Sequence, residues 1–201
     1  MTASNCTAFV GTKRIAHGDL REVAAKAKAA WDRDKWTQVL IFDDVTSHLV
    51  EVDFSGTPAD VARRVTQQGE PEPVTGAAAP VEARRPGRPK LGVVAREVTL
   101  LPRHWEWLAS QPGGASVALR KLVEQARGAN AGKDRARLAL ESAYRFLSAM
   151  AGNEAGYEEA IRALFANKRE AFELQVAAWP EDVRNHAVRL AAAAFAAGEE
   201  Q

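Results

Sequence analysis

The chain has 201 residues, of which 46% are hydrophobic and 26% are charged, and its formal net charge is +1. These values are ordinary for a globular protein of one or two domains, and they exclude a chain that is basic from end to end. No run of about 18 apolar residues occurs, so we expect no membrane-spanning helix. Residues 1–6 lack the pattern of a secretory signal and Cys6 is the only cysteine, so we expect a cytoplasmic protein.

The small net charge conceals an uneven distribution. Residues 84–145 hold 13 basic and 5 acidic side chains, a balance of +8, whereas the rest of the chain carries −7. A basic centre between acidic ends indicates either a polyanionic partner for the centre or ion pairs between parts of the same chain. Charge alone favours neither explanation.

The N-terminal segment, residues 1–68, predicts a small α/β domain with the element order ββαββα. Asp19 is placed to cap the first helix. Residues 39–42 form a short apolar run typical of a buried strand, and residues 47–54 alternate as a further strand would. Pro58 then takes the first position of a second helix.

Residues 69–92 differ in composition, because they contain five prolines and four glycines. Such a segment buries too little apolar surface to offset its chain entropy, so it predicts a flexible linker. The linker ends in a basic run, Arg84-Arg-Pro-Gly-Arg-Pro-Lys90. This run resembles an AT-hook in Gly87-Arg-Pro, with Pro86 where the family has its first Arg. The resemblance implies a minor-groove arm, and a plain charged linker is the alternative.

The functional prediction depends on the central segment that follows. Residues 94–100 alternate, with Val94, Val98 and Leu100 on one face and Ala95, Glu97 and Thr99 on the other. Pro102 starts a helix, Gln111-Pro-Gly-Gly ends it, and Ser116 is placed to cap a second helix.

This order of elements resembles the ribbon-helix-helix module of small bacterial repressors over residues 93–127. The resemblance implies a homodimer whose two strands pair antiparallel and enter the major groove of double-stranded DNA. It also implies base contacts from the strand, and phosphate contacts from the Ser116 helix start and the next turn. With the basic arm, the expected DNA-binding residues are Arg84, Arg85, Arg88, Lys90, Ala95, Glu97, Thr99, Ser116, Arg120 and Lys121.

Glu97 departs from the family pattern, which places basic or amide side chains on the groove face. Arg96, the basic residue of the strand, lies on the opposite face. Either the register is shifted by one residue or base readout is weak. A dimerising protein-interaction module without DNA binding is therefore the alternative.

Residues 131–201 are rich in alanine, and their helical spacing predicts a bundle of three or four helices. Gly152 and Gly156 separate the first two helices, and Pro180 opens the last. Together the segments predict an α+β protein with four parts. These are an α/β domain (1–68), a flexible basic linker (69–92), a ribbon-helix-helix-like module (93–130) and a helical bundle (131–201).

No catalytic pattern accompanies these elements. The four histidines lie apart in the sequence, and Asp43-Asp44 is interpreted as a solvated turn. We therefore expect no enzyme, no metal site and no cofactor. Over most of its length the chain is similar to an uncharacterised bacterial family. The shared runs are Gly87-Arg-Pro-Lys-Leu through Leu100-Leu-Pro-Arg-His-Trp-Glu-Trp-Leu108, and Trp179-Pro-Glu-Asp-Val. This resemblance implies no activity.

Overall fold

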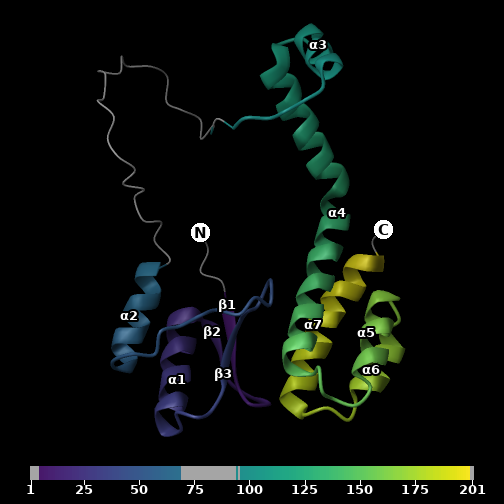
Figure 1. The fold of residues 1–201 in the computed structure, drawn as a ribbon. Coiled ribbons are helices and arrows are strands. Elements are labelled where there is room, and N and C mark those ends of the chain that lie inside the picture. Colours follow the sequence, from purple (N-terminus) through teal and green to yellow (C-terminus); the bar gives the residue numbers. More distant parts are fainter. Residues whose placement is uncertain (1–4, 69–93, 95, 200–201) are drawn as a thin grey trace, which may run out of the picture. The chain divides into compact units, whose positions relative to one another are not determined.

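The computed structural model describes residues 5–68, 94 and 96–199, which form a three-stranded antiparallel sheet and seven helices, with the first helix between the second and third strands (Figure 1). The predicted α+β class is therefore confirmed. These residues fall into two compact units. The first contains the described residues up to Gln68 and from Asn130 onward, and the second contains those from Val94 to Ala129.

The sheet has the order β2-β1-β3, with β1 (Asn5–Val10) in the centre and both β2 (Lys13–Asp19) and β3 (Val39–Asp43) antiparallel to it. Residues opposite one another in such a ladder share a face of the sheet. Thr7 pairs with His17 of β2 and with Phe42 of β3, so these three side chains belong to one face. Cys6 and Ala8 belong to the other.

The face with Cys6 and Ala8 packs on α1 (Leu20–Arg33), which contributes Val23 and Ala27 to a small apolar core. The helix begins where the sequence predicts, because Asp19 Oδ1 accepts a hydrogen bond from the Arg21 backbone N–H at 2.9 Å. A second helix, α2 (Pro58–Gln68), also begins at its predicted proline.

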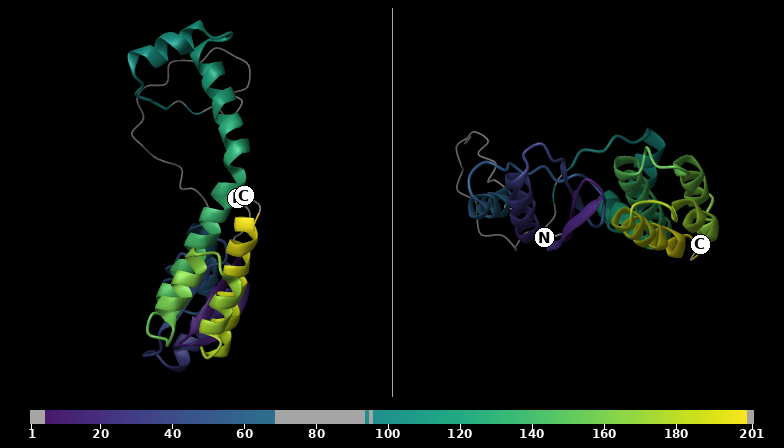
Figure 2. Two further views of the ribbon diagram at one scale, coloured as in Figure 1. Left: turned by 90° about the vertical axis from the view of Figure 1, so that its right-hand side faces the viewer. Right: turned by 90° about the horizontal axis from the view of Figure 1, so that it is seen from below.

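The opposite face of the sheet packs on the C-terminal helices, and Figures 1 and 2 show the sheet between α1 and these helices. The ring centroid of Phe146 lies 5.5 Å from that of Phe9 and 5.2 Å from that of Phe42. One continuous core therefore joins residues of the predicted N-terminal domain to residues of the predicted bundle. The sequence predicts two separate domains here, because the periodicity of a segment shows which of its faces is apolar but not what covers that face.

The C-terminal helices are the second half of α4 (Gly114–Met150), α5 (Tyr157–Phe165), α6 (Arg169–Val176) and α7 (Glu181–Glu199). A left-handed residue, Asn167 (φ +54°), follows α5. Its N–H donates to the Leu164 carbonyl, and the Lys168 N–H donates to the Ala163 carbonyl. This pair of hydrogen bonds is the Schellman motif, which fixes the exit from α5.

The segment after β3 differs from the prediction of a strand over residues 47–54. The described chain there forms only one isolated bridge, between Phe42 and Leu49. Asp43 Oδ1 accepts hydrogen bonds from the backbone N–H groups of Val45 and Thr46, and Ser47 adopts φ +53°. This tight turn leads the chain back toward β3 without a continuous ladder.

The second unit contains α3 (Pro102–Ser110) and the first half of α4. Helix α4 is continuous from Gly114 to Met150, so the predicted boundary at residue 130 falls inside a helix. Ser116 lies in the first turn of α4 and not at its N-cap, because the chain reverses two residues earlier through Gly113 and Gly114, both at positive φ. Residues 120–131 of this helix are all exposed.

Candidate functional site

Half of the predicted DNA-binding residues can be located in the structure. Arg84, Arg85, Arg88, Lys90 and Ala95 lie outside the described residues. Glu97, Thr99, Ser116, Arg120 and Lys121 are described, and all five side chains are exposed. The second unit therefore provides the geometry that can be compared with the predicted nucleic-acid interface.

The segment that the sequence predicts as a strand is assigned to no strand in the described structure. Residues 96–100 belong to no helix and to no sheet of the described chain, and Val98 is 53% exposed. They form no helix and pair with no other described residue.

The two helices after this segment form a hairpin around two glycines. The Gln111 N–H donates to the Leu108 carbonyl, and the Gly114 N–H donates to the Gln111 carbonyl at 2.9 Å. A Cβ on Gly113 would come within 3.1 Å of the Val117 side chain, so a larger residue would crowd the first turn of α4. Leu108 of α3 and Ala118 of α4 are the buried side chains of this hairpin among the described residues.

Large apolar side chains remain uncovered around the hairpin. Six of them are between 40% and 54% exposed, namely Val98, Leu101, Trp105, Trp107, Leu122 and Val123. Single exposed apolar residues are common, but a group of six within one small unit is typical of a protein-interaction surface. Both tryptophans of α3 belong to this group.

The basic residues of α4 near this hairpin differ in their partners. The Arg120 Nε–H donates to the Ser116 carbonyl at 3.1 Å, and Arg127 pairs with Glu124 at 3.0 Å. Within the described residues, neither Arg120 nor Lys121 takes part in an ion pair with a carboxylate. Their charges are therefore available to an anion such as a phosphate.

A second group of polar side chains lies in the first unit, between the sheet and α7. The Thr7 hydroxyl donates to Asp44 Oδ1 at 2.6 Å, and His17 Nδ1 lies 3.1 Å from Asp44 Oδ2. Arg189 of α7 lies 3.8 Å from Asp44 Oδ1. The Asp44 side chain is only 9% exposed, so the interpretation of Asp43-Asp44 as a solvated turn is wrong for Asp44.

The polar group was missed because its members come together only in the folded chain. Thr7 and His17 are opposite one another in the register of β1 and β2. A prediction of that register from the sequence would have placed these two side chains on the same face of the sheet. Thr7 is 1% exposed, and its hydroxyl is one of the groups that satisfy the buried Asp44 carboxylate, whereas the His17 side chain is 52% exposed. The described residues hold no group of three or more side chains suited to bind a metal ion.

Two buried titratable groups also have shifted pKa values. Burial, together with the nearby carboxylates of Asp43 and Asp44, raises the pKa of Cys6 to about 11. A thiol with this pKa stays protonated at neutral pH, so Cys6 is not a nucleophile. Burial, together with Arg189, lowers the pKa of His186 to about 3. His186 is therefore a neutral core residue.

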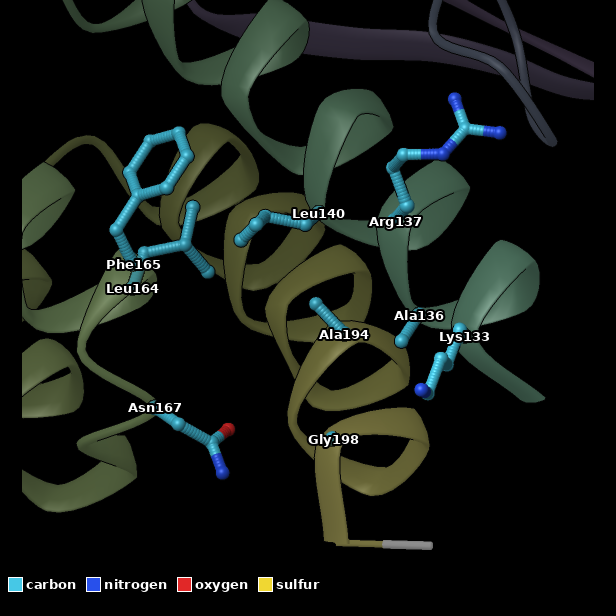
Figure 3. Close-up of a pocket in the computed structure, with 9 residues that line it drawn as sticks. All are labelled: Lys133, Ala136, Arg137, Leu140, Leu164, Phe165, Asn167, Ala194 and Gly198. Atoms are coloured by element: carbon cyan, nitrogen blue, oxygen red, sulfur yellow. The ribbon is translucent and has the colours of Figure 1, made fainter. Parts of the chain in front are cut away.

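A hollow of about 340 Å³ opens between α4, α5 and α7 within the first unit (Figure 3). Five of its nine lining residues have apolar side chains, and the others are one glycine, two basic residues and one amide. The lining residues are Lys133, Ala136, Arg137, Leu140, Leu164, Phe165, Asn167, Ala194 and Gly198. No acidic side chain lines it in the described structure.

No helix in the described part of the chain is both long and apolar enough to cross a membrane. No curated protein and no solved structure matches the chain. One family model matches residues 5–191, which is most of the chain and covers residues of both compact units. The chain therefore belongs to the family described as uncharacterized protein conserved in bacteria (DUF2239).

Proposed function

We propose that this protein is a dimeric DNA-binding regulator whose dimer forms through residues 94–129 of two copies. The observation that carries the proposal is the unpartnered state of one small unit. Its segment 96–100 pairs with no other described residue, and six large apolar side chains around the adjoining helices are exposed.

A second copy would satisfy both features. Backbone N–H and C=O groups of an isolated strand remain without ladder partners, and two antiparallel copies supply them to one another. Burial of Val98 and Leu101 together with the α3 tryptophans would add apolar contact, at roughly 25 cal/mol for each Å² removed from water. Dimerisation therefore explains why these side chains are large and apolar.

Contact with DNA is supported by charge and by the start of α4. The unit that comprises residues 71–129 holds nine basic and five acidic residues in sequence, a balance of +4. The Gly114 N–H already donates to the Gln111 carbonyl, but the N–H groups after it in the first turn of α4 have no partner within the helix and favour a phosphate. Arg120 and Lys121, one turn later, carry charges that no described carboxylate neutralises.

The alternative function is a dimerising protein-interaction module without DNA binding. Glu97 favours it, because a carboxylate on the groove face would be repelled by phosphates unless it accepts a hydrogen bond from cytosine N4. The nearly neutral total charge of +1 also favours it. A stoichiometric protein partner in the absence of nucleic acid would support this alternative.

Two measurements test the proposal on the full-length chain. Light scattering over a range of concentrations should give a dimer, and Val98→Asp should shift it toward monomer because an unpaired carboxylate would be buried at the ribbon. A stable wild-type monomer would refute the ribbon. Gel shifts with random and genomic duplexes should give a slope of log K against log salt of about −4 to −5, if roughly five phosphates are neutralised.

The variant Arg120→Ala/Lys121→Ala should weaken binding to all duplexes and make the salt slope shallower by roughly 2. The matched control is Arg162→Ala/Lys168→Ala, which removes two exposed cations of the first unit. Equal loss in both double variants would indicate nonspecific attraction by net charge. Unchanged affinity in the first variant would show that α4 does not contact phosphates.

A further inference from the structure

We propose that the hollow between α4, α5 and α7 is a binding site for a small amphipathic carboxylate, with Lys133 and Asn167 at its anionic end. The site lies entirely within the first unit, and the proposal does not depend on DNA binding. It rests on three properties of the lining, which are its small side chains, its exposed aromatic ring and its uncompensated cation.

The hollow exists because the residues that meet there are small. Ala136 of α4 faces Ala194 and Gly198 of α7, where longer side chains would fill the space between the helices. A Cβ on Gly198 would come within 3.2 Å of the Asn167 amide. Glycine therefore allows that amide to form one wall. A volume of about 340 Å³ is at the small end of the range for ligand sites, which suits a compact ligand.

The apolar part of the lining provides a surface for a hydrocarbon tail. Figure 3 shows Leu140 and Leu164 pointing toward one another across the hollow. Phe165 stands at its edge with 56% of its surface exposed, and its ring packs edge-on against Tyr144 at a centroid distance of 5.7 Å. A tail seated on these three side chains would remove apolar surface from water that folding leaves exposed.

The polar part of the lining selects an anion. Arg137 lies 3.3 Å from Asp134 and 3.2 Å from Glu141, and Figure 3 shows its guanidinium pointing away from the apolar side chains. Lys133 takes part in no ion pair among the described residues, and no carboxylate lines the hollow there. Its ammonium group is therefore the cation available to a ligand carboxylate.

Asn167 adds a directional hydrogen-bond donor. The Schellman motif fixes the Asn167 backbone at φ +54°, and the exposed side chain lies at the edge of the hollow. Its amide N–H adds a donor for a carboxylate beside the charge of Lys133. A carboxylate head between Lys133 and Asn167 with a short alkyl or aryl tail matches this arrangement.

The test titrates the full-length protein with octanoate and 4-phenylbutanoate, followed by NMR of its amide resonances, with 1-octanol as the neutral comparison. We expect saturable binding that moves the Asn167 side-chain resonance and the resonances of Ala194 and Gly198. Ala194→Leu should fill the hollow and weaken binding of both carboxylates at least tenfold. Urea unfolding of this variant checks that it folds.

Two milder variants separate the anionic end from the hollow itself. Lys133→Met should weaken binding of the carboxylates roughly three- to tenfold and leave 1-octanol unchanged, since it removes an exposed charge but keeps the stem. Asn167→Gly should weaken carboxylate binding without loss of stability, because glycine also adopts positive φ. Lys168→Met, an exposed lysine that does not line the hollow, is the matched control and should bind like the wild type.

The proposal is overturned if neither carboxylate binds saturably below millimolar concentration. It is also overturned if binding survives Ala194→Leu, or if Lys133→Met affects the carboxylates and 1-octanol equally. A stabilised Ala194→Leu variant together with a wild type that binds nothing would identify the hollow as a packing defect.

Discussion

The buried imidazole of His186 makes stability depend on pH in a direction that the structure specifies. The side chain is 3% exposed and its ring centroid lies 4.4 Å from that of Phe146 and 5.5 Å from that of Phe9. A guanidinium nitrogen of Arg189 lies 3.2 Å from its Nε2, and Arg14 and His17 are the other nearby positive or titratable groups. A proton on this ring would place a cation in an apolar site beside another cation.

The size of the effect follows from the two pKa values. Burial and the neighbouring cations lower the pKa of His186 from its ordinary 6.5 to about 3 in the folded chain. Between these values the unfolded chain binds a proton that the folded chain does not. The stability is therefore complete above pH 6.5 and falls as the pH decreases through the unfolded pKa. From pH 7 to pH 5 this one residue should cost about 2 kcal/mol of unfolding free energy.

Urea unfolding at pH 7, 6 and 5 measures this loss directly. His186→Gln cannot titrate, so its unfolding free energy should decrease by about 2 kcal/mol less than that of the wild type over the same range, whatever its stability at pH 7. His104→Gln removes an exposed histidine of α3 and should behave like the wild type. If His186→Gln loses as much stability as the wild type between pH 7 and pH 5, the assignment of His186 as the acid-sensitive group is refuted.

Three further predictions concern stability and are measured by denaturant unfolding at pH 7. Phe146→Ala should cost about 3–5 kcal/mol, since it empties the contact between the sheet and the helices, and a loss under 1 kcal/mol would contradict the shared core. Asn167→Ala should cost roughly 1–2 kcal/mol and Asn167→Gly almost nothing, because alanine resists positive φ; equal effects would contradict the Schellman geometry. Ser47→Ala should cost roughly 1–2 kcal/mol, because it leaves the buried Ser142 hydroxyl without its 2.8 Å partner. Ser47→Ala/Ser142→Ala should recover part of that loss, and simple additivity would contradict the pairing.

Local chemistry made several element boundaries predictable from the sequence. Asp19 caps α1, Pro58 opens α2, Pro102 opens α3, and α7 begins directly after Pro180. Each of these depends on a side chain or ring that acts on its own backbone within one turn. Neighbouring residues in the sequence contain that information.

Long-range contacts were not accessible in this way. The sequence around Phe9 and Phe42 does not indicate that Phe146 packs against them. The burial of Asp44 depends on residues from β1, β2 and α7. Apolar stripes predicted a packed bundle but not the hollow, because Ala136 and Ala194 look like ordinary core positions until their neighbours are known. The nucleic-acid residues were proposed from a resemblance, and their test requires a second chain and DNA.

The exposed middle of α4 has a consequence for local opening of the backbone. Residues 120–131 are all exposed, and glycines at positions 128 and 132 each cost about 1 kcal/mol relative to alanine in a helix. Amide hydrogens there should exchange with solvent far faster than those of residues 142–147, where the same helix is largely buried. Any molecule that binds to residues 120–131 would slow this exchange. Deuterium uptake along α4 would therefore report whether a ligand is bound there, without an activity assay.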